Sequence, residues 1–254
     1  MSSELKFSVA DWTFYNGNTD RLSCYKKMAE AGFIFLETVQ EARWNIAKSA
    51  GLRILNTDAP GRAEGINDPA YHDIMITGIK EAIQKAVDNE IPQLILFEGK
   101  KIGIPDEVAL ENSVACLRKI VPYAEEAGIM LAIELSNSFE GDNQSGSIAY
   151  GINMARQVDS PFFKIIYCTY QRNLMKENIA DDLVANLDYI AHIHVAGAAD
   201  RCYPGPGSGI PYDEIIPKVY NAGYNGLWGL EFFPKGDDIE DLIKIRDLFN
   251  SYIS

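Results

Sequence analysis

The stretch YIAHIHVAGAADR, residues 189–201, carries the pattern that decides the fold. If residues 190–195 form a strand, side chains two positions apart point to the same side, so His192 and His194 share one face and apolar residues fill the other. A polar inner face behind an apolar outer face suits a barrel strand whose carboxyl end opens into a site. A loop of small residues ending in Arg201 follows at once. Two histidines could equally satisfy polar contacts in a packed core, so the rest of the chain has to decide between these interpretations.

Apolar segments of strand length alternate with longer helical patterns along the whole chain. We expect strands at residues 7–11, 33–39, 52–57, 93–99, 129–134, 162–168, 190–195 and 226–232. We expect helices at residues 20–31, 41–50, 69–89, 106–127, 147–158, 175–187, 212–222 and 239–254, with Pro122 either kinking its helix or starting a new segment.

The strand-helix alternation predicts the fold class. Short apolar strands separated by helices imply parallel strands that are buried on both faces. Eight such units in one chain predict an α/β fold, a single-domain (β/α)8 TIM barrel over residues 1–254. A doubly wound open sheet is the alternative, but the chain lacks the glycine fingerprint with which dinucleotide-binding folds pass from strand to helix.

Composition narrows the functional classes. The formal net charge is −13 and no Lys/Arg-rich run occurs, so a polyanion such as DNA would be repelled and no nucleic-acid partner is expected. No apolar run could cross a bilayer and the N-terminus lacks a signal-peptide pattern, which predicts a cytoplasmic protein without a membrane partner. Four cysteines in 254 residues are too few for a disulfide scaffold. These features fit an enzyme that acts on a small molecule.

Polar side chains lie at or near the ends of the last four expected strands, where a barrel of this kind carries its reactive groups. The residues are Glu134, Cys168, His194 and Glu231. Acidic side chains within apolar strands are costly unless they are paired, protonated or bound to a metal. Two carboxylates and an imidazole that converge from adjacent strands predict a divalent-metal site, although a single strand-end glutamate is often only a salt-bridge partner.

At these residues the chain resembles the xylose-isomerase-like TIM barrels, which include hydroxypyruvate isomerases, inosose-processing enzymes and tagatose/psicose-type 3-epimerases. The resemblance spans nearly the whole chain, and the hydroxypyruvate isomerases are the most similar branch around NTDAPG and VAGAADR. The passages that carry it are LRILNTDAPG (52–61), AIELSNS (132–138), FFKIIYCTYQRNLMKEN (162–178), AHIHVAGAADR (191–201), GSGIPYDEI (207–215) and GLEFFP (229–234).

The resemblance implies an activity and its residues. One divalent ion (Mn²⁺, Mg²⁺, Co²⁺ or Zn²⁺) would be held by Glu134, Cys168, His194 and Glu231. The two glutamates would also be catalytic and would move protons through an enediolate, which isomerises or epimerises a sugar or a small keto or hydroxy acid. The substrate-binding residues would be Arg201, Gln171, Tyr170 and Asn56. Relatives are often dimers or tetramers, so a homo-oligomer is a further expectation.

The chain departs from the family pattern at three positions. Cys168 stands where relatives have a metal-binding aspartate, Gln171 where they have histidine, and Cys202 where histidine often follows the arginine. A thiolate is a softer ligand than a carboxylate and would shift metal preference from Mg²⁺ or Mn²⁺ toward Zn²⁺.

These departures keep other hypotheses open. One is a divergent relative that has lost the metal or the chemistry and binds carbohydrate. Another is a disulfide, or shared zinc binding, between Cys168 and Cys202. Apurinic-site endonuclease activity, found in the same superfamily, is disfavoured because the chain has only three histidines and an acidic surface. We expect His192 to lie one layer deeper than His194 and to be structural.

Overall fold

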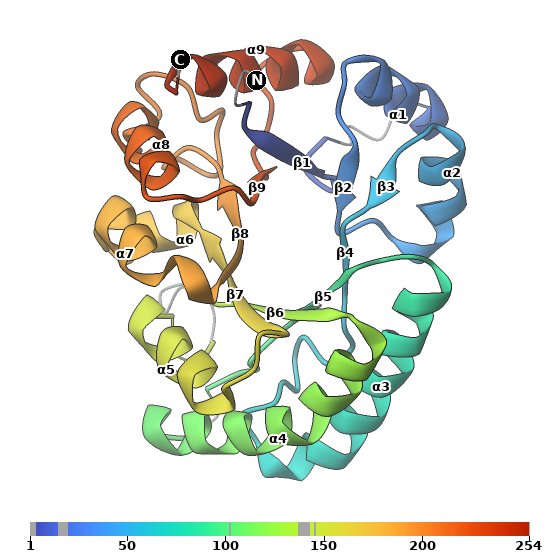
Figure 1. The fold of residues 1–254 in the computed structure, drawn as a ribbon, viewed down its shortest axis with the longest axis vertical. Coiled ribbons are helices and arrows are strands. Elements are labelled where there is room, and N and C mark those ends of the chain that lie inside the picture. Colours follow the sequence, from blue (N-terminus) through green and yellow to red (C-terminus); the bar gives the residue numbers. More distant parts are fainter. Residues whose placement is uncertain (1–3, 15–19, 102, 137–142, 145, 254) are drawn as a thin grey trace.

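The computed structural model describes residues 4–14, 20–101, 103–136, 143–144 and 146–253. They form a barrel of parallel strands inside a ring of helices (Figure 1). The strand segments follow the order β3-β2-β1-β9-β8-β7-β6-β5-β4, and the two end segments, β3 (Arg53–Ile54) and β4 (Asn56–Asp58), are separated in the chain by Leu55 alone. They are therefore two halves of one barrel strand, and the predicted (β/α)8 barrel is confirmed.

The remaining elements lie close to the ranges expected from the sequence. The other strands are β1 (Lys6–Ala10), β2 (Phe35–Glu37), β5 (Gln93–Leu96), β6 (Met130–Glu134), β7 (Phe163–Cys168), β8 (Ile190–Val195) and β9 (Leu227–Leu230). The helices are α1 (Arg21–Glu30), α2 (Trp44–Ser49), α3 (His72–Asp88), α4 (Asp106–Ala127), α5 (Ile148–Val158), α6 (Thr169–Leu174), α7 (Ile179–Asn186), α8 (Tyr212–Asn221) and α9 (Asp238–Ser251).

The segment after β7 differs from the expectation. Helix α6 begins directly at the end of β7, and the helix expected from residue 175 starts only at Ile179. Lys176 adopts a positive φ of 58°, which ends the helical path, and Asn178 then caps α7 by accepting a hydrogen bond from the backbone N–H of Asp181. Helix α4, in contrast, runs through Pro122 without starting a new segment.

Alternation along the strands sets the layers inside the barrel. A small apolar cluster that includes Ala132 and Ile166 is separate from the main core, which lies between strands and helices. Because residues two apart share a face, Glu134 and Cys168 project from the next layer toward the carboxyl ends of the strands. The barrel interior therefore changes from apolar to polar where a site is expected.

The last helix covers the amino-terminal end of the first strand. The side-chain oxygen of Asn250 on α9 accepts a hydrogen bond of 2.8 Å from the backbone N–H of Leu5, and Arg246 bonds to the carbonyl of Ala31. Figure 1 shows α9 beside β1. Among the described residues, no helix is long and apolar enough to cross a membrane.

Candidate metal centre

Four potential ligands meet at the carboxyl ends of adjacent strands. Glu134 ends β6, Cys168 ends β7, His194 lies near the end of β8 and Glu231 directly follows β9. One ligand atom from each lies within 4.8 Å of the others. Nδ1 of His194 is 3.5 Å from Oε1 of Glu134 and 3.4 Å from Oε2 of Glu231, and Sγ of Cys168 is 3.7 Å from the same oxygen of Glu231. The structure thus brings together the four side chains that the sequence pattern selected.

The donor set fits a divalent cation. Nδ1 of His194 is buried and has no hydrogen-bond partner of normal length among the described residues. It faces two carboxylate oxygens and a thiol sulfur, which are ligand types that bind zinc together with an imidazole nitrogen. A buried imidazole nitrogen without a partner costs free energy, and a bound cation would remove this cost.

Arg201 already contacts two of these groups. Its Nη1 donates a hydrogen bond to Oε2 of Glu231 and lies 3.5 Å from Sγ of Cys168. The guanidinium carbon stands 4.6 Å from the ring centre of Tyr170 and 5.7 Å from that of Trp12, so aromatic faces hold the charge in place. Arg201 has a positive φ of 54°, and its carbonyl accepts a 2.7 Å hydrogen bond from the backbone N–H of Phe233. A constrained turn therefore directs this side chain into the centre.

Charges are strongly coupled within the centre. Burial alone would raise the pKa of Glu134, but His194, Arg201 and Arg62 outweigh it and lower that pKa to about 2. Burial would lower the pKa of His194, but the neighbouring carboxylates of Glu231 and Glu37 raise it well above 6.5. Glu134 is thus a carboxylate at neutral pH, and metal binding at His194 would release a proton.

A second polar cluster lies beneath the ligands and is called the floor here; it consists of Glu37, His192, Asn56 and Ser8. Its central residue, Glu37, was not selected from the sequence. Oε2 of Glu37 lies 2.9 Å from Nε2 of His192 and 2.9 Å from Nε2 of His194. The same oxygen accepts a 2.8 Å hydrogen bond from the amide of Asn56, and Oε1 accepts one from the hydroxyl of Ser8. Burial alone would raise the pKa of Glu37, but the two histidines hold it well below its usual range. The signal that found Glu134, an acid ending an apolar strand, applies equally to Glu37.

The floor also determines the positions of Asn56 and His192. Asn56, expected to contact substrate, is instead fully buried, and its amide bonds to Glu37 and, at 3.1 Å, to Gln93. The buried side chain thus belongs to the floor rather than to the wall of an opening. His192 lies in the layer below His194, as expected for a structural residue, and is 1% exposed.

The remaining predicted residues lie around the centre. Tyr170 and Gln171 are buried on α6, which starts one residue after Cys168, and Tyr170 packs against Arg201. Cys168 and Cys202 are both free thiols, so the alternative of a disulfide between them is wrong for this structure.

A cavity of about 380 Å³ adjoins Glu134. Its wall residues are Arg62, Ala63, Phe97, Glu98, Gly99, Lys100, Glu134, Leu135, Ser136, Asn143 and Gln144. Polar side chains predominate on this wall, so the cavity suits a substrate with several hydroxyl or carboxyl groups. Burial raises the pKa of Glu98 to about 8, against the opposing effect of a hydrogen bond from the hydroxyl of Tyr150. At neutral pH the cavity wall therefore carries a neutral carboxylic acid.

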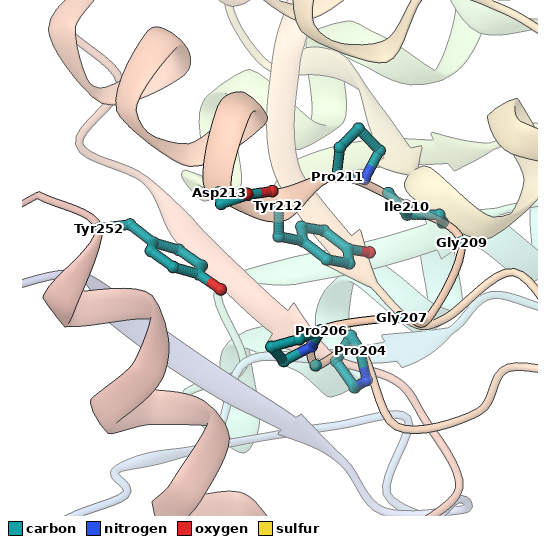
Figure 2. A pocket seen from close by; sticks show the side chains of 10 residues that line it. Pro204, Pro206, Gly207, Gly209, Ile210, Pro211, Tyr212, Asp213 and Tyr252 are labelled. Atoms are coloured by element: carbon teal, nitrogen blue, oxygen red, sulfur yellow. The ribbon is translucent and has the colours of Figure 1, made fainter.

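Another cavity, of about 340 Å³, lies outside the centre (Figure 2). The loop from Pro204 to Pro211, the start of α8 and Tyr252 line it, and Figure 2 shows the Tyr212 and Tyr252 rings on its two sides. None of its lining residues is one of the four potential ligands. Backbone hydrogen bonds connect this loop to its surroundings, among them one from the N–H of Ala198 to the carbonyl of Ser208.

Comparison with known proteins assigns the family. The family described as "Xylose isomerase-like TIM barrel" matches residues 25–248. The chain belongs to this family. The resemblance seen in the sequence is thereby confirmed, together with the fold class.

Curated relatives of this xylose isomerase-like barrel are isomerases and epimerases. The chain is 28% identical over 214 residues to D-psicose 3-epimerase of Enterocloster bolteae, which covers 80% of this chain and 69% of that protein. It is 23% identical over 238 residues to a mouse protein provisionally named hydroxypyruvate isomerase, which covers 88% of this chain and 85% of that protein. The chain is thus related to enzymes of the sugar isomerase and epimerase class.

Solved structures of low identity share the fold. A D-psicose 3-epimerase from Clostridium cellulolyticum H10, solved with D-tagatose, superposes with a TM-score of 0.80 at 18% identity, covering 98% of this chain and 100% of that one. An AP endonuclease of family 2 from Brucella melitensis gives a TM-score of 0.82 at 17% identity, covering 94% and 97%. Because a similar backbone carries both names, the choice of activity depends on the side chains of the centre.

Proposed function

We propose that this protein is a metal-dependent isomerase or epimerase of a ketose or of a small keto or hydroxy acid. The observation that carries the proposal is the convergence of Glu134, Cys168, His194 and Glu231 within 4.8 Å beside a polar cavity. The epimerases and isomerases among the curated relatives support the same class.

The residues of the chain divide the work of a proton-transfer reaction. A cation held by the four ligands would polarise the carbonyl and hydroxyl oxygens of the substrate and stabilise enediolate charge. Glu134, a carboxylate that borders the cavity, would take a proton from substrate carbon. Glu231 would return a proton, to the neighbouring carbon for isomerisation or to the opposite face for epimerisation. Arg201 would bind a substrate oxygen, since its guanidinium reaches Glu231 from the loop after β8.

Cys168 points to a preference for zinc. Of the four ligands it is the only sulfur donor, and thiolate favours Zn²⁺ over the harder ions Mg²⁺ and Mn²⁺. We therefore propose that the purified protein contains zinc when the growth medium supplies it together with manganese.

The test combines metal content with activity. We expect about one divalent ion per chain and turnover of at least one member of a panel of ketoses, inososes and hydroxypyruvate. Glu231→Ala should abolish both, whereas Asp241→Asn, which changes a buried acid on α9 away from the centre, should retain both. Full metal occupancy in Glu231→Ala would refute the ligand assignment.

A second candidate is a carbohydrate-binding relative without the metal. The contacts of Arg201 with Glu231 and Cys168 favour it, because a guanidinium already neutralises part of the ligand set. In that case the double variant Cys168→Asp, Gln171→His should gain metal binding that the wild type lacks. Tight metal binding and ketose turnover by the wild type would exclude this candidate.

A further inference from the structure

We propose that Glu37 is a positioning residue that fixes the His194 ring so that Nδ1, and not Nε2, is the metal ligand. The inference rests on the proposed metal-dependent function and extends it to a residue outside the ligand set. It depends on three observations: the contacts of the Glu37 carboxylate, the surroundings of the two His194 nitrogens, and the space left by a glycine on β9.

The Glu37 carboxylate is surrounded by hydrogen-bond donors. Asn56 donates to Oε2 and Ser8 donates to Oε1, while Nε2 of His192 and Nε2 of His194 each lie 2.9 Å from Oε2. Glu37 is fully buried, so no water competes for these positions. Three of these contacts converge on Oε2 and one is made to Oε1, so both carboxylate oxygens are held in place.

This contact decides which His194 nitrogen carries the proton. Nε2 of His194 lies 2.9 Å from Oε2 of Glu37 and 2.9 Å from Nε2 of His192. A lone pair on Nε2 would be repelled by the carboxylate oxygen, so we place the proton on Nε2 and direct it to Glu37. The lone pair of the neutral ring then belongs to Nδ1. That nitrogen is the one that faces Glu134 and Glu231, at 3.5 and 3.4 Å.

The same arrangement shows why Glu37 and His192 are floor residues rather than a second metal site. The two imidazole nitrogens and the carboxylate oxygen stand at hydrogen-bond spacing, 2.9 Å apart. A cation among them would need further ligands, yet the polar neighbours Ser8 and Asn56 donate to Glu37 instead. A carboxylate that accepts the outer N–H of a ligating histidine is a frequent second partner in metalloproteins.

Gly229 makes room for this floor. It lies opposite His194 across the β8–β9 pair and opposite Ser8 across the β1–β9 pair. A Cβ at this position would stand 2.4 Å from Oε1 of Glu37 and 2.8 Å from Cδ2 of His194. The barrel thus contains a slot in which the carboxylate and the imidazole ring fit only beside a residue without a side chain.

The experiment reads the protonation of the ring directly. The experiment uses zinc-loaded protein with ¹⁵N-labelled histidine. Only the signals of His72, His192 and His194 have to be assigned, and His72→Gln removes the signal of the histidine outside the centre. We expect His194 to show a proton on Nε2 and a metal-shifted Nδ1. In Glu37→Gln this pattern should be lost, and calorimetry should show the Kd for Zn²⁺ raised by about 10–100-fold. Asp241→Asn, an acid-to-amide change at a buried site on α9, should leave both readouts unchanged.

The outcomes separate this inference from the proposed function. Zinc on Nε2 of His194, or a Glu37→Gln protein with unchanged affinity and ring pattern, would overturn the role of Glu37 while leaving the metal-dependent function intact. If the wild-type protein binds no metal, the proposed function fails. The histidine ¹⁵N spectrum of the metal-free protein then tests whether Glu37 positions the His194 ring. An exchange-protected proton on Nε2 of His194 that disappears in Glu37→Gln would then support it, and its absence from the wild type would refute it.

Discussion

The neutral carboxyl of Glu98 should make the protein less stable at alkaline pH, and Glu98→Gln should remove this effect. Glu98 is 6% exposed on the cavity wall, and burial raises its pKa from an ordinary 4.5 to about 8. A group whose pKa is raised on folding stabilises the folded state fully below the unfolded pKa, and this contribution is lost as pH rises through the folded pKa. Wild-type stability should therefore decline between about pH 4.5 and pH 8.

The size of this decline follows from the two pKa values. Within the interval the unfolded chain has released a proton that the folded chain retains, so the free energy of unfolding falls by about 1.4 kcal/mol per pH unit. Over the whole interval the loss amounts to about 5 kcal/mol, a large part of the stability of a typical domain. Glutamine keeps the oxygen that accepts the hydrogen bond from Tyr150 but does not titrate.

Urea unfolding at pH 5, 7 and 9 measures the effect. We expect the stability of the wild type relative to Glu98→Gln to fall as pH rises, with most of the loss complete by pH 9. Other titrating groups contribute equally to both proteins and cancel in the difference. Parallel pH profiles for the two proteins would show that Glu98 is ionised in the folded state and would refute the reasoning.

Three further predictions concern the centre. Cys168→Asp should shift the ratio of Zn²⁺ to Mn²⁺ affinity toward Mn²⁺ by about tenfold or more, because a hard oxygen replaces the thiolate. Competition calorimetry measures this ratio. An unchanged ratio would contradict metal ligation by Cys168. Gly229→Ala should lower the free energy of unfolding by about 1–3 kcal/mol, since its Cβ would overlap Glu37. The control Gly236→Ala has nothing within 4 Å of its Cβ and should not lower it. Equal urea midpoints for the two variants would contradict the requirement for a residue without a side chain at position 229. Arg201→Gln should lower the Kd for metal by about tenfold, because its charge-assisted hydrogen bond to Glu231 no longer competes with the metal. The same variant should raise KM in steady-state assays. Unchanged metal affinity would show that Arg201 does not compete for Glu231.

The fold and the ligand set could be predicted because both depend on local rules. Strand period and helix period are visible in a single sequence, and the carboxyl ends of parallel strands meet at one end of a barrel. Glu134, Cys168, His194 and Glu231 follow from these two rules, and the structure brings them together.

Glu37 ends an apolar strand as Glu134 does, but the role of the floor could not be predicted because it depends on contacts between distant strands. Glu37 ends a strand of only three residues, and its role appears only when Ser8, Asn56 and His194 surround it. Contacts between distant strands also explain the position of the Asn56 side chain. Asn56 lies near a strand end as expected, but its amide points toward Glu37 in the floor. The late start of the helix expected at 175–187 depends on the left-handed Lys176, a residue type without a strong preference for that conformation.

The spread of the centre along the chain sets an order of events during biosynthesis. Strand β9 fills the gap between β1 and β8, so the earliest strand to leave the ribosome finds one of its two neighbours only near the end of translation. At a synthesis rate of about 5–20 residues per second, roughly 10–40 s separate the appearance of Glu37 from that of Glu231. Until Glu231 has emerged, the four potential ligands cannot come together. If the centre binds a metal as proposed, the complete set of four ligands is available to it only after β9 has closed the barrel.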